Sequence, residues 1–144
     1  MRWTLLQSAN PFHCWKLEQD GFIAELKYNK ESHSFRVEAT DKRLFFIEKT
    51  GLLQNKFLIR NEYNVIAAEI SSAKDLHSGA VILDNKKYNY FLKDNLLVLS
   101  SKKEKAPFST EIKDRNALDR QQLCALLFCT LRIARSHKAE PAIA

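Results

Sequence analysis

The run Leu123-Cys-Ala-Leu-Leu-Phe-Cys129 places seven consecutive apolar residues near the C-terminus of a chain of 144 residues. Seven residues make about two turns of α-helix, so every face of these turns is apolar. A helix that lies on the surface of a sheet keeps a polar stripe toward water. The run therefore predicts a helix that the rest of the protein encloses.

The expected helix spans residues 117–135 and contains neither glycine nor proline. Asn116 is the expected N-cap, and Asp119 follows three residues later, where a carboxylate can accept from free backbone N–H groups. Two arginines lie near the other end, where cations suit the negative end of the helix dipole. Residues 139–144 are expected to form a frayed tail.

Upstream of the helix, residues 1–112 consist of short apolar or alternating runs separated by polar clusters. This rhythm is typical of antiparallel β-structure. In Phe22-Ile-Ala-Glu-Leu-Lys-Tyr28, for example, apolar and charged side chains alternate as in a half-buried strand. Asp84-Asn85 and Asp94-Asn95 suit tight hairpins because both residue types tolerate positive φ. The runs predict about twelve strands.

So many strands must hide their edges, and closing into a barrel removes the edges altogether. A barrel of about twelve strands is too wide to be filled by its own side chains, so another element must occupy the middle. The apolar helix fits that vacancy. The sequence therefore predicts a single domain over residues 1–144 that is mainly β: a closed antiparallel barrel of about 12 strands around a central hydrophobic C-terminal α-helix.

Three segments carry a resemblance to a known family: Arg43-Leu-Phe-Phe-Ile-Glu48, Phe57-Leu-Ile-Arg-Asn-Glu-Tyr-Asn-Val-Ile66 and the closing helix Leu118 to Arg135. Their layout resembles the tubby-like superfamily, and within it the LURP-one-related and phospholipid-scramblase-like branch. The resemblance implies a twelve-stranded barrel around a central helix. It also implies anionic lipid as a ligand class, since the tubby proteins bind membrane phosphoinositides. The phosphoinositide-binding motif of the tubby branch is not found in this chain, so the resemblance transfers no lipid-contacting residue.

The chain carries 23 Lys and Arg against 17 Asp and Glu, a formal charge of +6, which favours anionic partners. Most basic residues alternate with acidic ones along the chain, so no nucleic-acid partner is expected. The lysines of two dense clusters are the candidate ligand-binding residues, as a basic rim for lipid headgroups. They are Lys86, Lys87, Lys102, Lys103 and Lys105.

No grouping of reactive side chains points to an enzyme. His13 and Cys14 are neighbours on an expected strand, so their side chains point to opposite faces. Cys124 and Cys129 lie about 140° apart around a helix, too far to share one metal ion, and fit the core as small apolar residues. The three glycines are isolated, so no phosphate-binding loop is present. We expect no catalytic activity, no cofactor and no metal.

The N-terminus lacks the apolar stretch of a signal peptide, and no apolar run approaches the roughly 20 residues of a transmembrane helix. Three cysteines, an odd number, suit a reducing compartment. A cytoplasmic protein, free or peripheral to a membrane, is expected.

Three binding functions stay open at this point. The leading hypothesis is a non-enzymatic module that recognises anionic membrane phospholipid headgroups through an outer basic surface. The second is a protein-interaction module without lipid affinity. The third is a barrel that holds a small ligand, as lipocalins do. The enclosed helix disfavours the third hypothesis because the helix of a lipocalin packs outside its barrel, and it moves the expected function to the outer surface.

Overall fold

The computed structural model describes residues 1–37, 43–50, 56–72, 77–102, 108–113 and 118–139. Short polar segments divide the first part of the chain into strands, and one helix follows. The elements are β1 (Arg2–Ala9), β2 (Phe12–Gln19), β3 (Phe22–Asn29), β4 (Ser34–Val37), β5 (Leu44–Thr50), β6 (Lys56–Asn61), β7 (Ile66–Ser72), β8 (Ser78–Leu83), β9 (Lys86–Lys93), β10 (Leu96–Ser100), β11 (Phe108–Ile112) and α1 (Arg120–Ala139).

The strands form a closed barrel in which each strand pairs with its neighbours in sequence, and β11 returns to β1. The predicted barrel is confirmed, with eleven strands among the described residues where about twelve were expected. The closing pair corrects the expectation of a purely antiparallel sheet: β1 and β11 run parallel, with Arg2 opposite Glu111 and Trp3 opposite Ile112. An odd number of strands in an up-and-down order leaves the first and the last pointing the same way, so the closing pair cannot be antiparallel.

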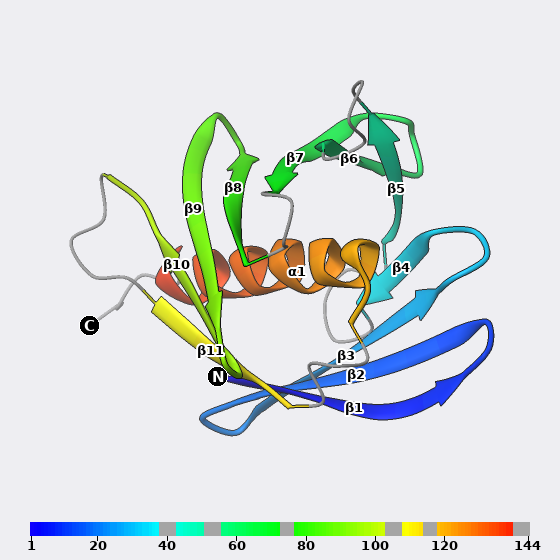
Figure 1. Ribbon diagram of the computed structural model, residues 1–144, viewed down its shortest axis with the longest axis horizontal. Coiled ribbons are helices and arrows are strands. Elements are labelled where there is room, and N and C mark those ends of the chain that lie inside the picture. Colours follow the sequence, from blue (N-terminus) through cyan, green and yellow to red (C-terminus); the bar gives the residue numbers. More distant parts are fainter. Residues whose placement is uncertain (38–42, 51–55, 73–76, 103–107, 114–117, 140–144) are drawn as a thin grey trace.

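Helix α1 crosses the inside of the barrel, with strands on all sides of it (Figure 1). Every residue from Gln122 to Leu131 is buried, which is more than two full turns. The facing strand residues are apolar at alternate positions, as Ala24, Leu26 and Tyr28 show on β3. The apolar run that predicted an enclosed helix therefore lies at the centre of the core.

The helix begins and ends later than the sequence suggested. Asp119, not Asn116, is the N-cap: its Oδ1 accepts the backbone N–H of Gln122 at 2.8 Å, and its backbone oxygen accepts that of Leu123 at 3.0 Å. Asn116 lies outside the described residues. At the other end the helix continues to Ala139, and the remainder of the expected tail lies outside the described residues.

The tight turns follow the expected chemistry. Asp84, Asn85 and Asp94 all have positive φ, at 50°, 62° and 55°. Strands β8 and β9, and then β9 and β10, can therefore reverse within two residues. These two hairpins place the candidate lysines of β9 beside the residues that follow β10.

Candidate functional site

Three of the five candidate lysines line one hollow near the β8–β9 turn. Lys86 and Lys87 open strand β9, and Lys102 follows the end of β10. All three are exposed, and together with Asn85, Asn89 and Ser101 they line a hollow of about 240 Å³. The register of the hairpin brings them together, since Asn89 on β9 pairs with Ser100 on β10. Lys103 and Lys105 lie outside the described residues.

The outer surface of strands β8, β9 and β10 continues this basic region. Tyr88, Tyr90 and Leu92 face the core, so the alternate positions of β9 point outward. The outward residues of the three strands are Ser78, Ala80, Ile82, Lys87, Asn89, Phe91, Lys93, Leu96, Val98 and Ser100. No carboxylate is among these ten residues. We call these residues, together with Lys86 and Lys102, the lysine face.

Elsewhere on the barrel, four outward cations have acidic partners. Across β5, β6 and β7, Arg60 lies 3.1 Å from Glu48 and Lys56 lies 3.4 Å from Glu69. Around β1, β2 and β11, Arg2 pairs with Glu111 and Lys16 with Glu18. Within the described part of the chain, none of the lysines of the lysine face forms such a pair. Among the described residues, therefore, no carboxylate is paired with these lysines.

Apolar side chains lie among these lysines. Phe91 is 50 % exposed at the middle of β9, where it lies opposite Ser78 on β8 and Val98 on β10. Ile82 and Leu96 are also well exposed on the neighbouring strands. Sequence reasoning missed Phe91 and Lys93 as candidates. The signal was present as the alternation Lys87, Asn89, Phe91, Lys93, which places these four side chains on one outward row.

The tyrosines interleaved with these lysines belong to the core. Tyr88 and Tyr90 are 1 % and 3 % exposed and point into the barrel. Their rings are therefore not available to stack on nucleic-acid bases.

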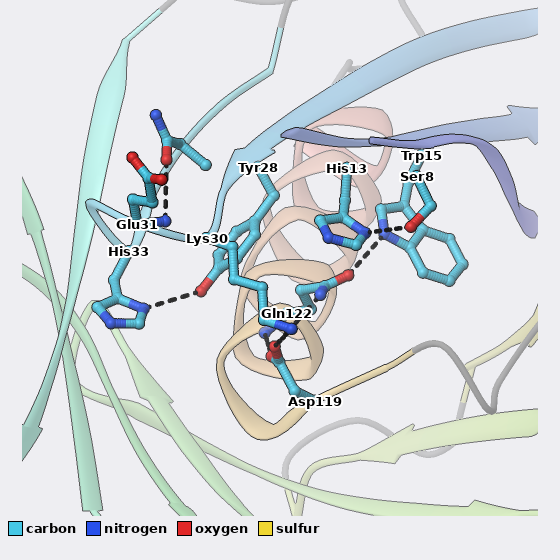
Figure 2. Close-up of polar contacts among 10 residues, drawn as sticks. Ser8, His13, Trp15, Tyr28, Lys30, Glu31, His33, Asp119 and Gln122 are labelled. Atoms are coloured by element: carbon cyan, nitrogen blue, oxygen red, sulfur yellow. Dashed lines mark hydrogen bonds and ion pairs between the residues drawn. The ribbon is translucent and has the colours of Figure 1, made fainter. Parts of the chain in front are cut away.

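The mouth of the barrel at the start of α1 holds a polar network (Figure 2). Lys30 approaches the Asp119 carboxylate at 4.0 Å, and the Trp15 indole N–H donates to Gln122 Oε1 at 3.2 Å. Burial raises the pKa of the Tyr28 phenol above its usual range, and the nearby charge of Asp119 adds to this effect. These contacts fix the first turn of the helix against β2 and β3.

This network contains one pair that resembles a catalytic dyad. Ser8 Oγ lies 3.0 Å from His13 Nδ1. In nucleophilic catalysis the second imidazole nitrogen is oriented by a further group, usually a carboxylate. Among the described residues, Nε2 of His13 is buried and has no hydrogen-bond partner. In the part of the chain that the structure describes, no group therefore orients this imidazole as a base.

The reactive side chains are otherwise dispersed. His13 is buried whereas Cys14 is half-buried on the opposite face of β2, as the strand geometry predicted. Cys124 and Cys129 are both buried in the core. Within the described ranges no three His, Cys, Asp or Glu side chains gather as metal ligands.

The same described ranges contain no helix that is both long and apolar enough to cross a bilayer. Comparisons with protein-family models, with curated proteins and with solved structures found no match to this chain.

Proposed function

We propose that this protein is a non-enzymatic binding module that docks on anionic phospholipid headgroups through the lysine face. The observation that carries the proposal is the convergence of Lys86, Lys87 and Lys102 on one hollow, with no acidic partner among the described residues. A phosphate group placed there would meet three cations that pair with no carboxylate of the described ranges. Each cation close to an anionic membrane surface adds about 1 kcal/mol to binding.

The apolar residues of the lysine face support a bilayer as the partner. An exposed aromatic ring among lysines can enter the interfacial region of a membrane while the cations contact headgroups. Phe91 occupies this position on β9. Under this proposal the protein is cytoplasmic and binds the membrane peripherally. The tubby-like relationship is likewise a proposal, supported by the layout of strands closed around a C-terminal helix.

Vesicle pelleting tests the lipid proposal. We expect the protein to pellet with phosphatidylcholine vesicles that contain phosphatidylserine, and not with pure phosphatidylcholine. Binding should weaken as salt rises to a few hundred millimolar, because the Debye length falls below about 8 Å. Replacing Lys86, Lys87 and Lys102 by Glu should remove roughly 3 kcal/mol, about a hundredfold in affinity.

A matched variant controls for net charge. Arg36, Lys49 and Lys113 are exposed cations outside the lysine face, and changing all three to Glu alters the total charge by the same amount. This control should keep most of the binding. Equal loss in both variants would show that only net charge matters, and equal pelleting with neutral vesicles, or none at all, would rule the proposal out.

A protein-interaction module is the second candidate, and one feature favours it. Tyr63, Val65 and Ile66, at the turn between β6 and β7, are 74 %, 57 % and 50 % exposed. Exposed apolar residues grouped in this way are typical of contact surfaces. Absence of vesicle binding would leave this turn as the stronger candidate surface.

A further inference from the structure

An apolar patch lies on the turn between β6 and β7. Tyr63 and Val65 are the two most exposed large hydrophobic side chains among the described residues, at 74 % and 57 %, and the neighbouring Ile66 is 50 % exposed. Single exposed apolar residues are ordinary, but three within four residues form a patch of the kind that marks a contact surface. The turn is therefore a candidate docking element.

The backbone of this turn is fixed by internal hydrogen bonds. Asn61 Oδ1 accepts the backbone N–H groups of Tyr63 at 2.9 Å and Val65 at 3.0 Å, and the N–H of Asn61 donates to the backbone oxygen of Val65 at 2.9 Å. Asn64 has the positive φ of 62° at which the chain reverses. A contact through Tyr63 and Val65 therefore requires little further ordering of the backbone, which favours binding.

The acidic residues of the two turns nearest the lysines and the patch already have hydrogen-bond donors. Glu62, within the β6–β7 turn, accepts the backbone N–H of Leu44 at 3.0 Å. Asp84, in the β8–β9 turn, accepts from Arg135 at 2.8 Å. Residues 61–65 and 84–85 contain no other carboxylate, so neither turn presents one without a donor.

The apolar patch and the lysines border the same mouth of the barrel. Successive hairpin turns of an up-and-down barrel alternate between its two ends, so the β6–β7 and β8–β9 turns lie at one end. Ile66 and Asn85 accordingly line one hollow of about 740 Å³. Asn85 also lines the smaller hollow of Lys86, Lys87 and Lys102. A partner that covers this mouth therefore meets cations and apolar side chains together.

An anionic bilayer matches this combination. Its headgroup layer attracts lysines, and its boundary with the acyl chains accepts apolar side chains to a depth of about 5–10 Å. Tyrosine suits this boundary because its ring is apolar and its hydroxyl is polar. Both layers extend across the whole contact, so one membrane reaches the patch and the lysines although β8 lies between β7 and β9. A protein partner would need an apolar pocket and an acidic surface at that same spacing.

We infer that the β6–β7 turn enters the interfacial layer of an anionic membrane, with Tyr63 and Val65 at its tip, so that this mouth of the barrel faces the bilayer. The inference rests on the proposed function, the docking of the lysines on phospholipid headgroups. It adds the element that enters the membrane and the orientation of the barrel. The opposite mouth, with the β1–β2 turn, then faces solvent.

Tryptophan reporters and brominated phosphatidylcholine test this orientation. Trp3 and Trp15 are fully buried, so the wild-type protein gives the background emission. With brominated vesicles that contain phosphatidylserine, the emission of Tyr63→Trp should shift to the blue and be quenched, because an indole at the acyl boundary leaves water and meets bromine. Phe12→Trp, at a position 53 % exposed at the opposite mouth, should show neither change.

A third reporter distinguishes docking by the mouth from docking by the side of the barrel. Phe91 is 50 % exposed on the outer surface of β9, about 17 Å along the strand from Lys86. Phe91→Trp should therefore be quenched less than Tyr63→Trp. Stronger quenching of Phe91→Trp would show that the barrel lies on its side and would overturn the inference.

Serine variants measure the contribution of the turn to binding. Val65→Ser or Tyr63→Ser should weaken vesicle binding by about threefold to tenfold, since each removes an apolar side chain from the interface. Phe12→Ser removes apolar surface at the opposite mouth and should change binding by less than about twofold. Neither serine in the turn removes its hydrogen bonds, which are made by backbone groups and by the Asn61 side chain.

The outcomes separate the inference from the proposed function. If vesicle binding depends on Lys86, Lys87 and Lys102 but Tyr63→Trp is not quenched, headgroup docking stands and the inference is wrong. If no vesicle binding is found, both are wrong. If Val65→Ser and Tyr63→Ser bind vesicles like the wild type, the turn is not a membrane anchor, and its patch is left to a protein partner.

Discussion

The indole N–H of Trp3 donates to Thr130 Oγ1 at 2.9 Å, which joins the first strand of the barrel to the central helix. Both residues are fully buried. Thr130 in turn donates its hydroxyl hydrogen to the backbone oxygen of Leu126 at 2.6 Å. The Thr130 hydroxyl therefore accepts one hydrogen bond and donates another. A residue near each end of the chain thus contributes to one polar contact inside an apolar core.

Removing the Trp3–Thr130 hydrogen bond should lower the free energy of unfolding. In Thr130→Val the shape is kept but the Trp3 indole N–H is left buried without its acceptor, which costs about 1–3 kcal/mol of unfolding free energy. Urea unfolding followed by tryptophan fluorescence measures the loss. Thr130→Ser keeps the hydroxyl and should lose less. A Thr130→Val protein as stable as wild type would show that the bond contributes nothing.

The enclosed position of the helix predicts the effect of a central charge. Leu127 is 0 % exposed, and in Leu127→Asp an unpaired carboxylate would be placed in the core. The cost of several kcal/mol is comparable with a typical total stability of about 5–15 kcal/mol, so the variant should not fold at neutral pH. Circular dichroism checks the result. Leu127→Met, which is similar in volume and apolar, should fold and lose less than about 1.5 kcal/mol.

The helix cap gives a smaller and more local prediction. Asp119→Ala removes the acceptor of the Gln122 backbone N–H and should cost about 1 kcal/mol in urea unfolding. Asp119→Asn keeps an acceptor oxygen and should lose less. Asn116→Ala should have little effect, because Asp119 already caps the helix; a larger loss from Asn116→Ala than from Asp119→Ala would contradict this assignment.

The cysteines should differ in reactivity. Burial raises the pKa of the Cys124 thiol above its ordinary value, and the charge of Asp119 adds to this effect. Since the thiolate is the reactive form, Cys124 and the buried Cys129 should resist a disulfide reagent at pH 8, whereas the half-buried Cys14 should react. Counting modified thiols by mass spectrometry before and after adding urea checks this, with Cys14→Ser as the control.

The raised pKa of Cys124 makes the free energy of unfolding fall as the solution becomes alkaline. The folded protein keeps the Cys124 proton at pH values where the unfolded chain, with an ordinary thiol pKa of about 8.5, releases it. The folded state then binds more protons, so unfolding free energy falls as pH rises above that value and is unaffected below it. In Cys124→Ala the part of the decline due to this thiol should disappear. An unchanged pH profile would rule out its contribution.

The sequence predicted the elements well because the signals for them are local. Alternation in Phe22 to Tyr28 reports which face of one strand is buried, and paired Asp and Asn at residues 84 and 85 report a turn. The N-cap was misassigned because Asn116 and Asp119 are both good N-cap residues. Which of the two caps the helix depends on where the chain begins its first helical turn.

The candidate site was only partly predictable. Lys86 and Lys87 stood out as a basic pair, but their proximity to Lys102 depends on the β9–β10 hairpin, and their lack of acidic partners depends on neighbouring strands. The hollow that Arg43, Phe128 and Arg132 line left no signal in the sequence, because Arg43 and Arg132 are far apart along the chain. Only packing of the helix against β5 brings them to one hollow.

The sequence alone determined that the chain is a set of short strands that encloses an apolar helix, because side-chain periodicity and a seven-residue apolar run express burial directly. The tertiary structure decided how the barrel closes, which lysines share a hollow and where the helix leaves space uncovered. Each of these depends on strand number, register and the contact of distant segments. No local pattern encodes such relationships, since each arises only when separate segments of the chain pack together.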